Sequence, residues 1–302
     1  MPRSTRPHLP QTHRLLLQAD LRPWQGQRFQ PTGFPDLGAA EFSTSQNTTS
    51  LLVESVQSMA NRLEAAVWDP LQQRPILADL PYVHHQHPQH GRLTSMTEAH
   101  RLASPYLFPL WQPRLVQELG GPPRGEWDLQ RLAATLLKWD PGSLLHGVFF
   151  INLKPVARLT RALSAFIEAR DVSVVLSGGV KLDQANPSGP AEQGKGHVPY
   201  PVSEYTSDQI TAYFNLDLLR LRSYGLSAPA VEMLFDLSLL KIRRFLDQGL
   251  RLRSACDFQA LDLRATHPQD FPLPQESALT ARLEKSLARL REDGQLASPL
   301  EL

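Results

Sequence analysis

The sequence lacks most of the features that mark secreted, membrane-bound and disulfide-stabilised proteins. It contains one cysteine, Cys256, so no intramolecular disulfide can form, as in proteins of a reducing compartment. No apolar run approaches the roughly 20 residues that cross a bilayer, and residues 1–13 lack the apolar core of a signal peptide. We therefore expect a soluble cytoplasmic protein, in which Cys256 is a small core residue and not a nucleophile.

Strong charge of one sign is also missing, because the formal net charge is +1. A basic tail or coat, the simplest sign of a nucleic-acid binder, is thereby excluded. Two segments nevertheless concentrate positive charge. Residues 1–34 hold five arginines against Asp20, and residues 241–253 hold five basic residues against Asp247. Two such segments on a balanced chain suit a groove for a polyanion, although two solvated faces would give the same counts.

The usual fingerprints of catalysis and cofactor binding are absent as well. The sequence has no phosphate-binding loop, no dinucleotide-binding glycine motif and no nucleophile elbow. Histidines gather in a loop at 81–92 and at His100, but no cysteine is near, which favours a histidine-rich surface loop over a zinc site. We expect no catalytic residue, metal or cofactor. A metal-independent ribonuclease with His100 or His197 as general base is the alternative.

What is present is a chain of 302 residues, 41% hydrophobic, which is long enough to bury a sizeable core. The hydrophobic pattern predicts strands at 13–20, 143–152, 171–177 and 212–218, an edge strand at 250–258, helices at 50–68, 127–138, 227–247 and 276–292, and a short amphipathic segment of helical character at 159–169. This order predicts an α+β fold, compatible with a ferredoxin-like sheet backed by two helices.

The helix predicted at 50–68 has an apolar stripe and an unusual polar face. Ser50 would cap the helix, Asp69-Pro70 would end it, and the stripe comprises Leu52, Val56, Met59, Leu63 and Val67. The opposite face carries Glu54 and, beyond it, Gln57, Ser58, Asn61 and Arg62. These amide, hydroxyl and guanidinium groups donate hydrogen bonds to phosphate and sugar. An ordinary exposed helix face is the alternative.

Residues 178–200 form the longest irregular stretch, with five glycines and three prolines. Loops of this length are usually functional or disordered, and the flanking strands indicate an excursion from a sheet. Together with 28–40, 51–64 and 98–107, the segment 177–189 combines turn residues with short polar groups and one basic residue. Backbone N–H groups freed by such turns can cradle phosphates.

At these segments the sequence resembles a known family. The matching strings are QPTGFPDLG (30–38), ESVQSMANRLE (54–64), SGGVK (177–181), ITAYFNLDL (210–218) and LRLRSACD (250–257). They resemble the backbone subunit of the type I-G (formerly I-U) CRISPR surveillance complex, Cascade, a member of the RAMP superfamily. The resemblance extends from about residue 14 to residue 260.

The resemblance implies a modified ferredoxin-like or RNA-recognition-motif palm with long inserted thumb and finger loops. The palm would span 13–260, with a finger or web region at about 70–125. The thumb candidate is 178–200, and 70–125 is the alternative source of the thumb. A flexible arm at 1–12 would precede it, and a Pro-rich segment with an amphipathic helix would follow at 261–302. That helix would pack on its own subunit or dock a partner.

The resemblance also implies a function in antiviral defence. The chain would be a non-catalytic, multi-copy subunit that holds the CRISPR RNA spacer by its sugar-phosphate backbone and presents it to target DNA. Its partners would be CRISPR RNA, the paired target DNA, further copies in a helical filament and other Cascade subunits, with no membrane. HGVFFIN (146–152) does not fit the aromatic string of RNA-recognition motifs, which argues against base stacking on the sheet.

We predict that the 28–34 loop, the 50–68 helix and the 178–200 excursion converge on one positively lined channel. The predicted RNA contacts are Arg28, Gln30, Thr32, Gln57, Ser58, Asn61, Arg62, Arg101, Gly178, Gly179, Lys181 and Asn186.

Overall fold

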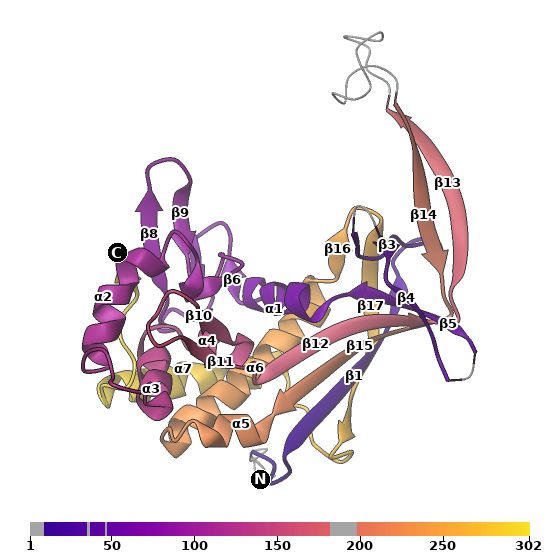
Figure 1. Cartoon of the computed structure of the whole chain (residues 1–302). Coiled ribbons are helices and arrows are strands. Elements are labelled where there is room, and N and C mark those ends of the chain that lie inside the picture. Colours follow the sequence, from indigo (N-terminus) through magenta and orange to yellow (C-terminus); the bar gives the residue numbers. More distant parts are fainter. Residues whose placement is uncertain (1–8, 35–36, 46, 182–197) are drawn as a thin grey trace.

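The computed structural model describes residues 9–34, 37–45, 47–181 and 198–302, and it confirms the α+β class. Among these residues, a seven-stranded antiparallel sheet forms the centre (Figure 1). Its order is β16 (Arg251–Arg253), β17 (Cys256–His267), β1 (Arg14–Pro23), β15 (Gln209–Asp217), β12 (Leu163–Arg170), β5 (Thr49–Glu54) and β4 (Glu41–Ser43).

Strict alternation of apolar residues explains the two central strands. Every second residue of β1 is buried, from Leu15 to Leu21, and β15 buries Ile210, Ala212, Phe214 and Leu216 in the same way. Leu17 lies directly opposite Phe214, so the buried sides of the two strands form one surface. Burial of each large apolar side chain contributes about 1.5–3 kcal/mol. The strands predicted at 13–20 and 212–218 are confirmed.

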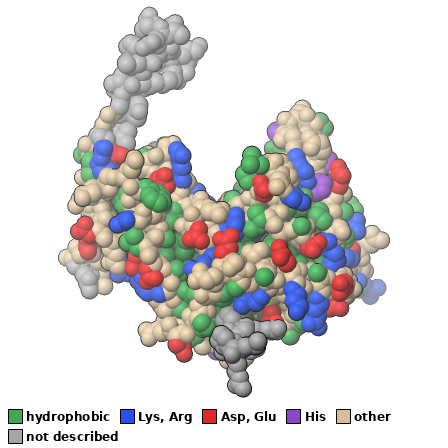
Figure 2. All heavy atoms as spheres, turned by 180° about the vertical axis from the view of Figure 1, so that it is seen from behind, with side chains coloured by type: hydrophobic (Ala, Val, Ile, Leu, Met, Phe, Trp, Pro, Cys, Tyr) green, Lys and Arg blue, Asp and Glu red, His purple; other side chains and the backbone are tan. Residues whose placement is uncertain are grey.

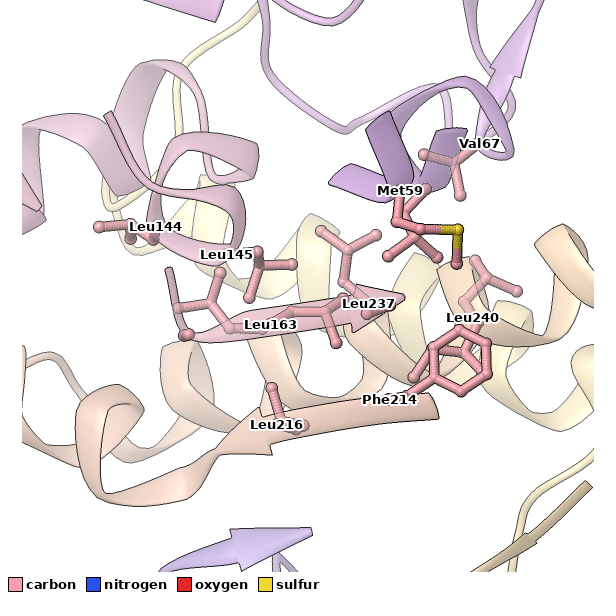
Figure 3. Packing of buried hydrophobic residues seen from close by; sticks show 14 of the residues in the cluster. Met59, Val67, Leu144, Leu145, Leu163, Phe214, Leu216, Leu237 and Leu240 are labelled. Atoms are coloured by element: carbon pink, nitrogen blue, oxygen red, sulfur yellow. The ribbon is translucent and has the colours of Figure 1, made fainter. Parts of the chain in front are cut away.

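Two helices cover this buried side of the sheet. They are α1 (Val56–Ala65) and α6 (Ala228–Gln248). Figure 3 shows residues of both helices gathered over side chains of β12 and β15: Met59, Leu237, Leu240, Leu163, Phe214 and Leu216. As predicted, Ser227 caps α6 and Gly249 follows its last turn.

The amphipathic helix near the C-terminus, α7 (Glu276–Glu292), packs on its own chain. Its four buried leucines, Leu279, Leu283, Leu287 and Leu290, are each 0% exposed. Arg282 of α7 binds Asp236 of α6 through two hydrogen bonds of 2.9 and 2.7 Å. Of the two roles considered for this helix, packing on its own subunit is therefore the one found.

Between β5 and β12 the chain builds an inserted region beside the sheet (Figure 1). It contains α1 and then β6 (Trp68–Asp69), β7 (Arg74–Pro75), β8 (Val83–His87), β9 (Gly91–Thr94), η1 (Arg101–Ala103), α2 (Phe108–Glu118), α3 (Leu129–Trp139), α4 (Gly142–His146), β10 (Val148–Phe150) and β11 (Ala157–Leu159). The helix predicted at 127–138 is confirmed as α3. The C-terminal β18 (Leu300–Glu301) pairs with β8.

A two-stranded arm projects from the other side of the sheet. Its strands are β13 (Ser173–Lys181) and β14 (Val198–Thr206), which pair along their whole length (Figure 1). The strand predicted at 171–177 is confirmed and extends further than expected. The remaining short elements are β2 (Gly33–Phe34), β3 (Gly38–Ala39) and α5 (Leu218–Ser223).

The first half of the helix predicted at 50–68 is wrong, because Thr49–Glu54 form strand β5. Leu51, Val53 and Glu54 are all buried there, between β12 and β4. Pairing with two distant segments satisfies the backbone of β5, and no local pattern reveals such partners. The helix begins after Ser55, not Ser50, and the Ser55 hydroxyl accepts a hydrogen bond from the backbone N–H of Ser58.

Three further predictions of local structure are wrong. The segment 143–152 is a short helix, α4, followed by β10, and Gly147 with φ 79° separates the two. The segment 159–169 is mostly strand β12, in which alternate residues from Leu163 to Ala169 are buried. The histidine-rich loop at 81–92 is largely a hairpin, β8–β9. The edge strand expected at 250–258 is present as β16.

A buried cluster of charged groups joins the helices to the inserted region. Its members are Glu64, Arg101, Asp140, His146 and Lys241, none more than 6% exposed. The Glu64 carboxylate lies 3.1 Å from Lys241 Nζ, 3.4 Å from His146 Nε2 and 3.6 Å from Arg101 Nε. A Cβ at Gly142 would lie 2.5 Å from the same carboxylate, so the close approach of α4 requires glycine.

Removal of one member of this buried cluster should lower the stability of the folded protein. Lys241→Ala leaves the Glu64 carboxylate buried with less compensation, so we expect a loss of about 3–5 kcal/mol in the free energy of unfolding. Urea denaturation measures this loss. Lys285→Ala, an exposed position on α7, is the matched control and should change stability little. Equal stabilities of the two variants would contradict the role of the cluster.

The cluster should also make stability depend on pH. Burial, and next the charge of Glu64, raises the pKa of Asp140 from 3.8 to about 7. The folded chain therefore retains a proton that the unfolded chain releases between about pH 4 and pH 7. Stability from this group falls as pH rises through that window. The Asp140→Asn variant has no such titrating group, so its free energy of unfolding should not fall in this way. The difference between variant and wild type should therefore increase with pH, by at most about 1.4 kcal/mol per pH unit. Urea denaturation at pH 5 and pH 7 measures it, and a constant difference would contradict it.

Candidate nucleic-acid interface

The loop before β2 is held against three separate elements by its backbone. Phe29 exchanges two hydrogen bonds of 2.9 Å with Tyr205 of β14. The Gln30 N–H donates to the carbonyl of Ala255 at 2.7 Å, and the Thr32 N–H donates to the carbonyl of Val53 at 3.0 Å. The Phe29 ring is buried and packs edge-on against Phe258 at 5.6 Å. The loop therefore connects the base of the arm to the β16–β17 turn and to β5.

Two arginines meet at a buried carboxylate beside this loop. Arg62 of α1 lies 3.2 Å from Glu54, and Arg253 of β16 bonds the same Glu54 oxygen. Arg62 also donates to the carbonyl of Leu252 at 2.7 Å, and Arg253 donates to the carbonyl of Gln30 at 2.9 Å. Each arginine side chain remains 25% exposed, whereas Glu54 is 1% exposed. The carboxylate thus fixes both guanidinium groups at the surface.

Arg28 links the same loop to the arm. Its guanidinium lies 2.8 Å from the Glu204 carboxylate of β14 and is 57% exposed. Nearby, Tyr205 donates a hydrogen bond to Glu41, and burial, followed by this bond, raises the pKa of Tyr205 to about 12. The phenol therefore stays protonated and the contact between β14 and β4 holds at neutral pH.

The predicted convergence of the loop, the helix and the excursion is found only in part. The described residues of the excursion, 178–181 and 198–200, lie further out along the arm and not at its base. The loop meets the base of the arm at Glu204 and Tyr205, and it meets β5, which leads directly into α1. From there α1 runs between the arm and the β8–β9 hairpin (Figure 1). Figure 2 shows that the surface is hollowed between these two projections. The positive lining of this surface is weaker than expected. Three arginines, Arg28, Arg62 and Arg253, are paired with two carboxylates, those of Glu54 and Glu204, so only one positive charge is in excess.

The predicted contact residues of α1 lie in different environments. Gln57 is exposed, and Ser58 and Asn61 are half-buried. Asn61 accepts a hydrogen bond of 3.3 Å from Arg101, so its carboxamide oxygen is occupied within the chain. In the loop, Gln30 is exposed and Thr32 is half-buried. Gln30, Gln57 and Ser58 thus remain available for a polar ligand.

Arg101 does not reach this surface. It is 6% exposed and belongs to the buried cluster around Glu64, so its guanidinium is committed to the protein interior. A sequence pattern that combines turn residues with one basic residue cannot distinguish an internal ion pair from a surface charge. We therefore correct the predicted set by removing Arg101.

The predicted residues of the arm are described only in part. Gly178 and Gly179 pair with Pro201 and Tyr200 inside the two-stranded arm. Lys181 is the last residue of β13 and pairs with Val198. Asn186 and His197 lie outside the described residues.

Arg253 is the residue of this surface that the individual predictions missed. It bonds Gln30 of the loop and Val53 and Glu54 of β5, and so joins the loop to the strand that leads into α1. It lies in the basic segment 241–253, which was noted only for its charge. Its partner, the Glu54 carboxylate, was expected on an exposed helix face. The ion pair between Arg253 and Glu54 was therefore not predicted.

The residues considered for chemistry have the following surroundings in the described part of the chain. Burial raises the pKa of Cys256 to about 12, so its thiol stays protonated at neutral pH. His100 is exposed and makes no side-chain hydrogen bond or ion pair with the described residues. The rings of His87, His90 and Tyr106 contact one another in tilted or T-shaped arrangements, with centroids 4.6–5.4 Å apart. Across the described ranges, no three or more His, Cys, Asp or Glu side chains are placed to hold a metal ion.

The aromatic residues of the sheet differ from expectation. The segment 146–152 is not a strand of the central sheet, so its poor fit to the RNA-recognition-motif string decides nothing. The central strand β15 carries Tyr213 on the side away from the helices, where it stacks on Phe166 of β12 at 5.0 Å and 22°. Carboxylates lie on the same side, including Asp20 and Asp217, each paired with an arginine.

No helix in the described part of the chain is both long and apolar enough to cross a bilayer. Solved structures with a similar chain path include a subunit of a "CRISPR RNA-guided surveillance complex, pre-nicking", with a TM-score of 0.45 and 12% identity over 93% of this chain and 89% of that chain. A second CRISPR RNA-guided surveillance complex gives a TM-score of 0.37, with 13% identity over 93% and 84%. Csc2 of Thermofilum pendens gives 0.34, with 10% identity over 95% and 79%.

No curated protein sequence matches the chain. One family model does: residues 15–174 match the family described as CRISPR-associated protein GSU0053. The match covers more than half of the 302 residues. It includes β1 from its second residue, the loop at 28–34, β5 and α1. The chain therefore belongs to the CRISPR-associated protein GSU0053 family.

Proposed function

We propose that this protein is the multi-copy backbone subunit of a type I-G CRISPR surveillance complex in the cytoplasm. It binds CRISPR RNA along the sugar-phosphate backbone, leaves the bases free to pair with target DNA, and performs no chemistry itself. Further copies of the chain, arranged as a helical filament, and other Cascade subunits are its protein partners. Membership of a CRISPR-associated family supports this proposal.

The observation that carries the proposal is the junction of the loop, α1 and the arm. Exposed or partly exposed guanidinium groups of Arg28, Arg62 and Arg253 lie there beside the polar residues Gln30 and Gln57. Such groups bind phosphate and ribose without reading a base. The carboxylates that hold the arginines keep the total charge low, so the surface favours an ordered backbone in a hollow over nonspecific coating.

The strand order supports a ferredoxin-like palm. Reading across the sheet, β17, β1, β15 and β12 are the fourth, first, third and second of these four strands in the chain, and all neighbours are antiparallel. Helix α1 lies between the first and second strands in sequence, and α6 lies between the third and fourth. This order supports our proposal of a ferredoxin-like palm, because that fold is built on a split β-α-β arrangement.

Binding should depend on salt and not on guide sequence. If six or more phosphates of a guide are neutralised along the filament, affinity should fall by about a thousandfold between 50 and 200 mM salt. Filter binding with two guides of unrelated spacer sequence measures both effects. Affinity that differs strongly between the guides, or that ignores salt, would count against the proposal.

Arg28 provides the most direct test of the interface, because its guanidinium is 57% exposed and its partner Glu204 keeps contact with solvent at 16% exposure. Arg28→Ala should weaken binding to all guides to a similar degree and reduce the slope of log affinity against log salt by about one for each bound copy. Arg289→Ala is the matched control, since Arg289 is similarly exposed at 67% on α7, away from the junction. If both substitutions have the same effect, Arg28 is not at the interface.

A further inference from the structure

The β10–β11 hairpin has one face that is firmly anchored in the protein. Its inward residues are buried: Val148, Phe150, Ala157 and Leu159. The Phe150 ring stacks on Phe108 of α2 at 5.0 Å and 21° and lies 6.1 Å from Trp111. Because this side fixes the two strands, their outward side chains are held in a defined arrangement.

The outward face is apolar and aromatic, although it faces solvent. Phe149 is 48% exposed and lies directly across from Arg158, whose guanidinium carbon is 5.9 Å from the ring centroid. Ile151 and Val156, next toward the turn, are 59% and 48% exposed. Three large exposed apolar side chains on one short hairpin indicate a binding surface, because single exposed residues are the normal case.

The charge around this face has one sign. Residues 141–167 contain no aspartate or glutamate, whereas Lys154, Arg158 and Arg161 are all exposed. Arg220 of α5 adds a fourth cation, since it donates a hydrogen bond to Thr160. In contrast to the junction around Glu54, these cations make no ion pair with a carboxylate of the described residues. The hairpin therefore carries unneutralised positive charge beside an exposed ring.

We propose that the outward face of β10–β11 binds single-stranded nucleic acid, with a base stacked on Phe149 and phosphates against Arg158 and Lys154. A polyanion with flat apolar rings matches an exposed ring surrounded by cations, and base stacking on aromatic residues tolerates any sequence. The other aromatic pair, Phe166 and Tyr213, lacks this match because the arginines Arg14 and Arg264 on that side are already paired with Asp217 and Asp20. This inference rests on the proposed function, to which it adds a contact with bases at a second surface.

The test compares two strands of equal length, a short uridine homopolymer and an abasic ribose-phosphate strand, in filter binding to the purified full chain. Stacking of one base should make the uridine strand bind about tenfold more tightly. Phe149→Ala should remove this preference and Phe149→Tyr should keep it, because tyrosine retains the ring. Leu129→Ala, which removes an apolar side chain 53% exposed on α3, should leave the preference unchanged.

Four outcomes would overturn the inference. If the preference survives Phe149→Ala, the base stacks elsewhere. If wild type binds both strands equally, base contact is absent, but the proposed backbone binding stands. If wild type binds neither strand, both proposals are wrong. If Phe149→Ala leaves both affinities unchanged and reduces only the size of the assembly on a sizing column, the hairpin is a protein-docking surface.

Discussion

The buried ion pair between Glu64 and Lys241 is the contact on which the arrangement of α1, α6 and the inserted region depends. Glu64 ends the buried side of α1, Lys241 lies in the middle of α6, and His146 and Arg101 bring in the inserted region. Such groups are costly to bury, and together they offset much of each other's desolvation. Their geometry fixes the rotation of α1, and that rotation determines which side chains face the hollow. The surface of the candidate interface is thus determined by contacts inside the protein.

A second consequence is that charge alone is a poor guide to this surface. Glu54 is almost fully buried, yet it holds two arginines at the surface, one from α1 and one from β16. Removal of such a carboxylate would raise the net charge and at the same time release the side chains that need to be positioned. Preorganised donors lose less conformational entropy when they bind a ligand than free ones do. The near-neutral total charge of the chain is therefore compatible with a phosphate-binding role.

Prediction from sequence succeeded where structure is local and failed where it depends on distant partners. The alternation in β1 and β15, and the capped amphipathic helices α6 and α7, can be read from neighbouring residues alone. Thr49–Glu54 could not, because its strand conformation depends on pairing with β12, more than a hundred residues away. The site followed the same division. The loop and the helix segment were identified, but the contact with the arm lies at Glu204 and Tyr205, outside the predicted excursion. Arg101 is buried and Arg253 is partly exposed, because burial and ion pairing depend on residues far away in the chain.

The arm has a further consequence, which concerns how such a protein can vary. Its two strands continue β12 and β15, with only residues 171–172 and 207–208 between them, so the arm leaves and re-enters the sheet at adjacent points. Phe29 and Arg28 brace its base. Insertions or deletions beyond that brace leave the ends of β12 and β15 in register, and the entropy of loop closure grows only slowly with length. Relatives can therefore change the reach of this element by lengthening or shortening it, without any compensating change in the core.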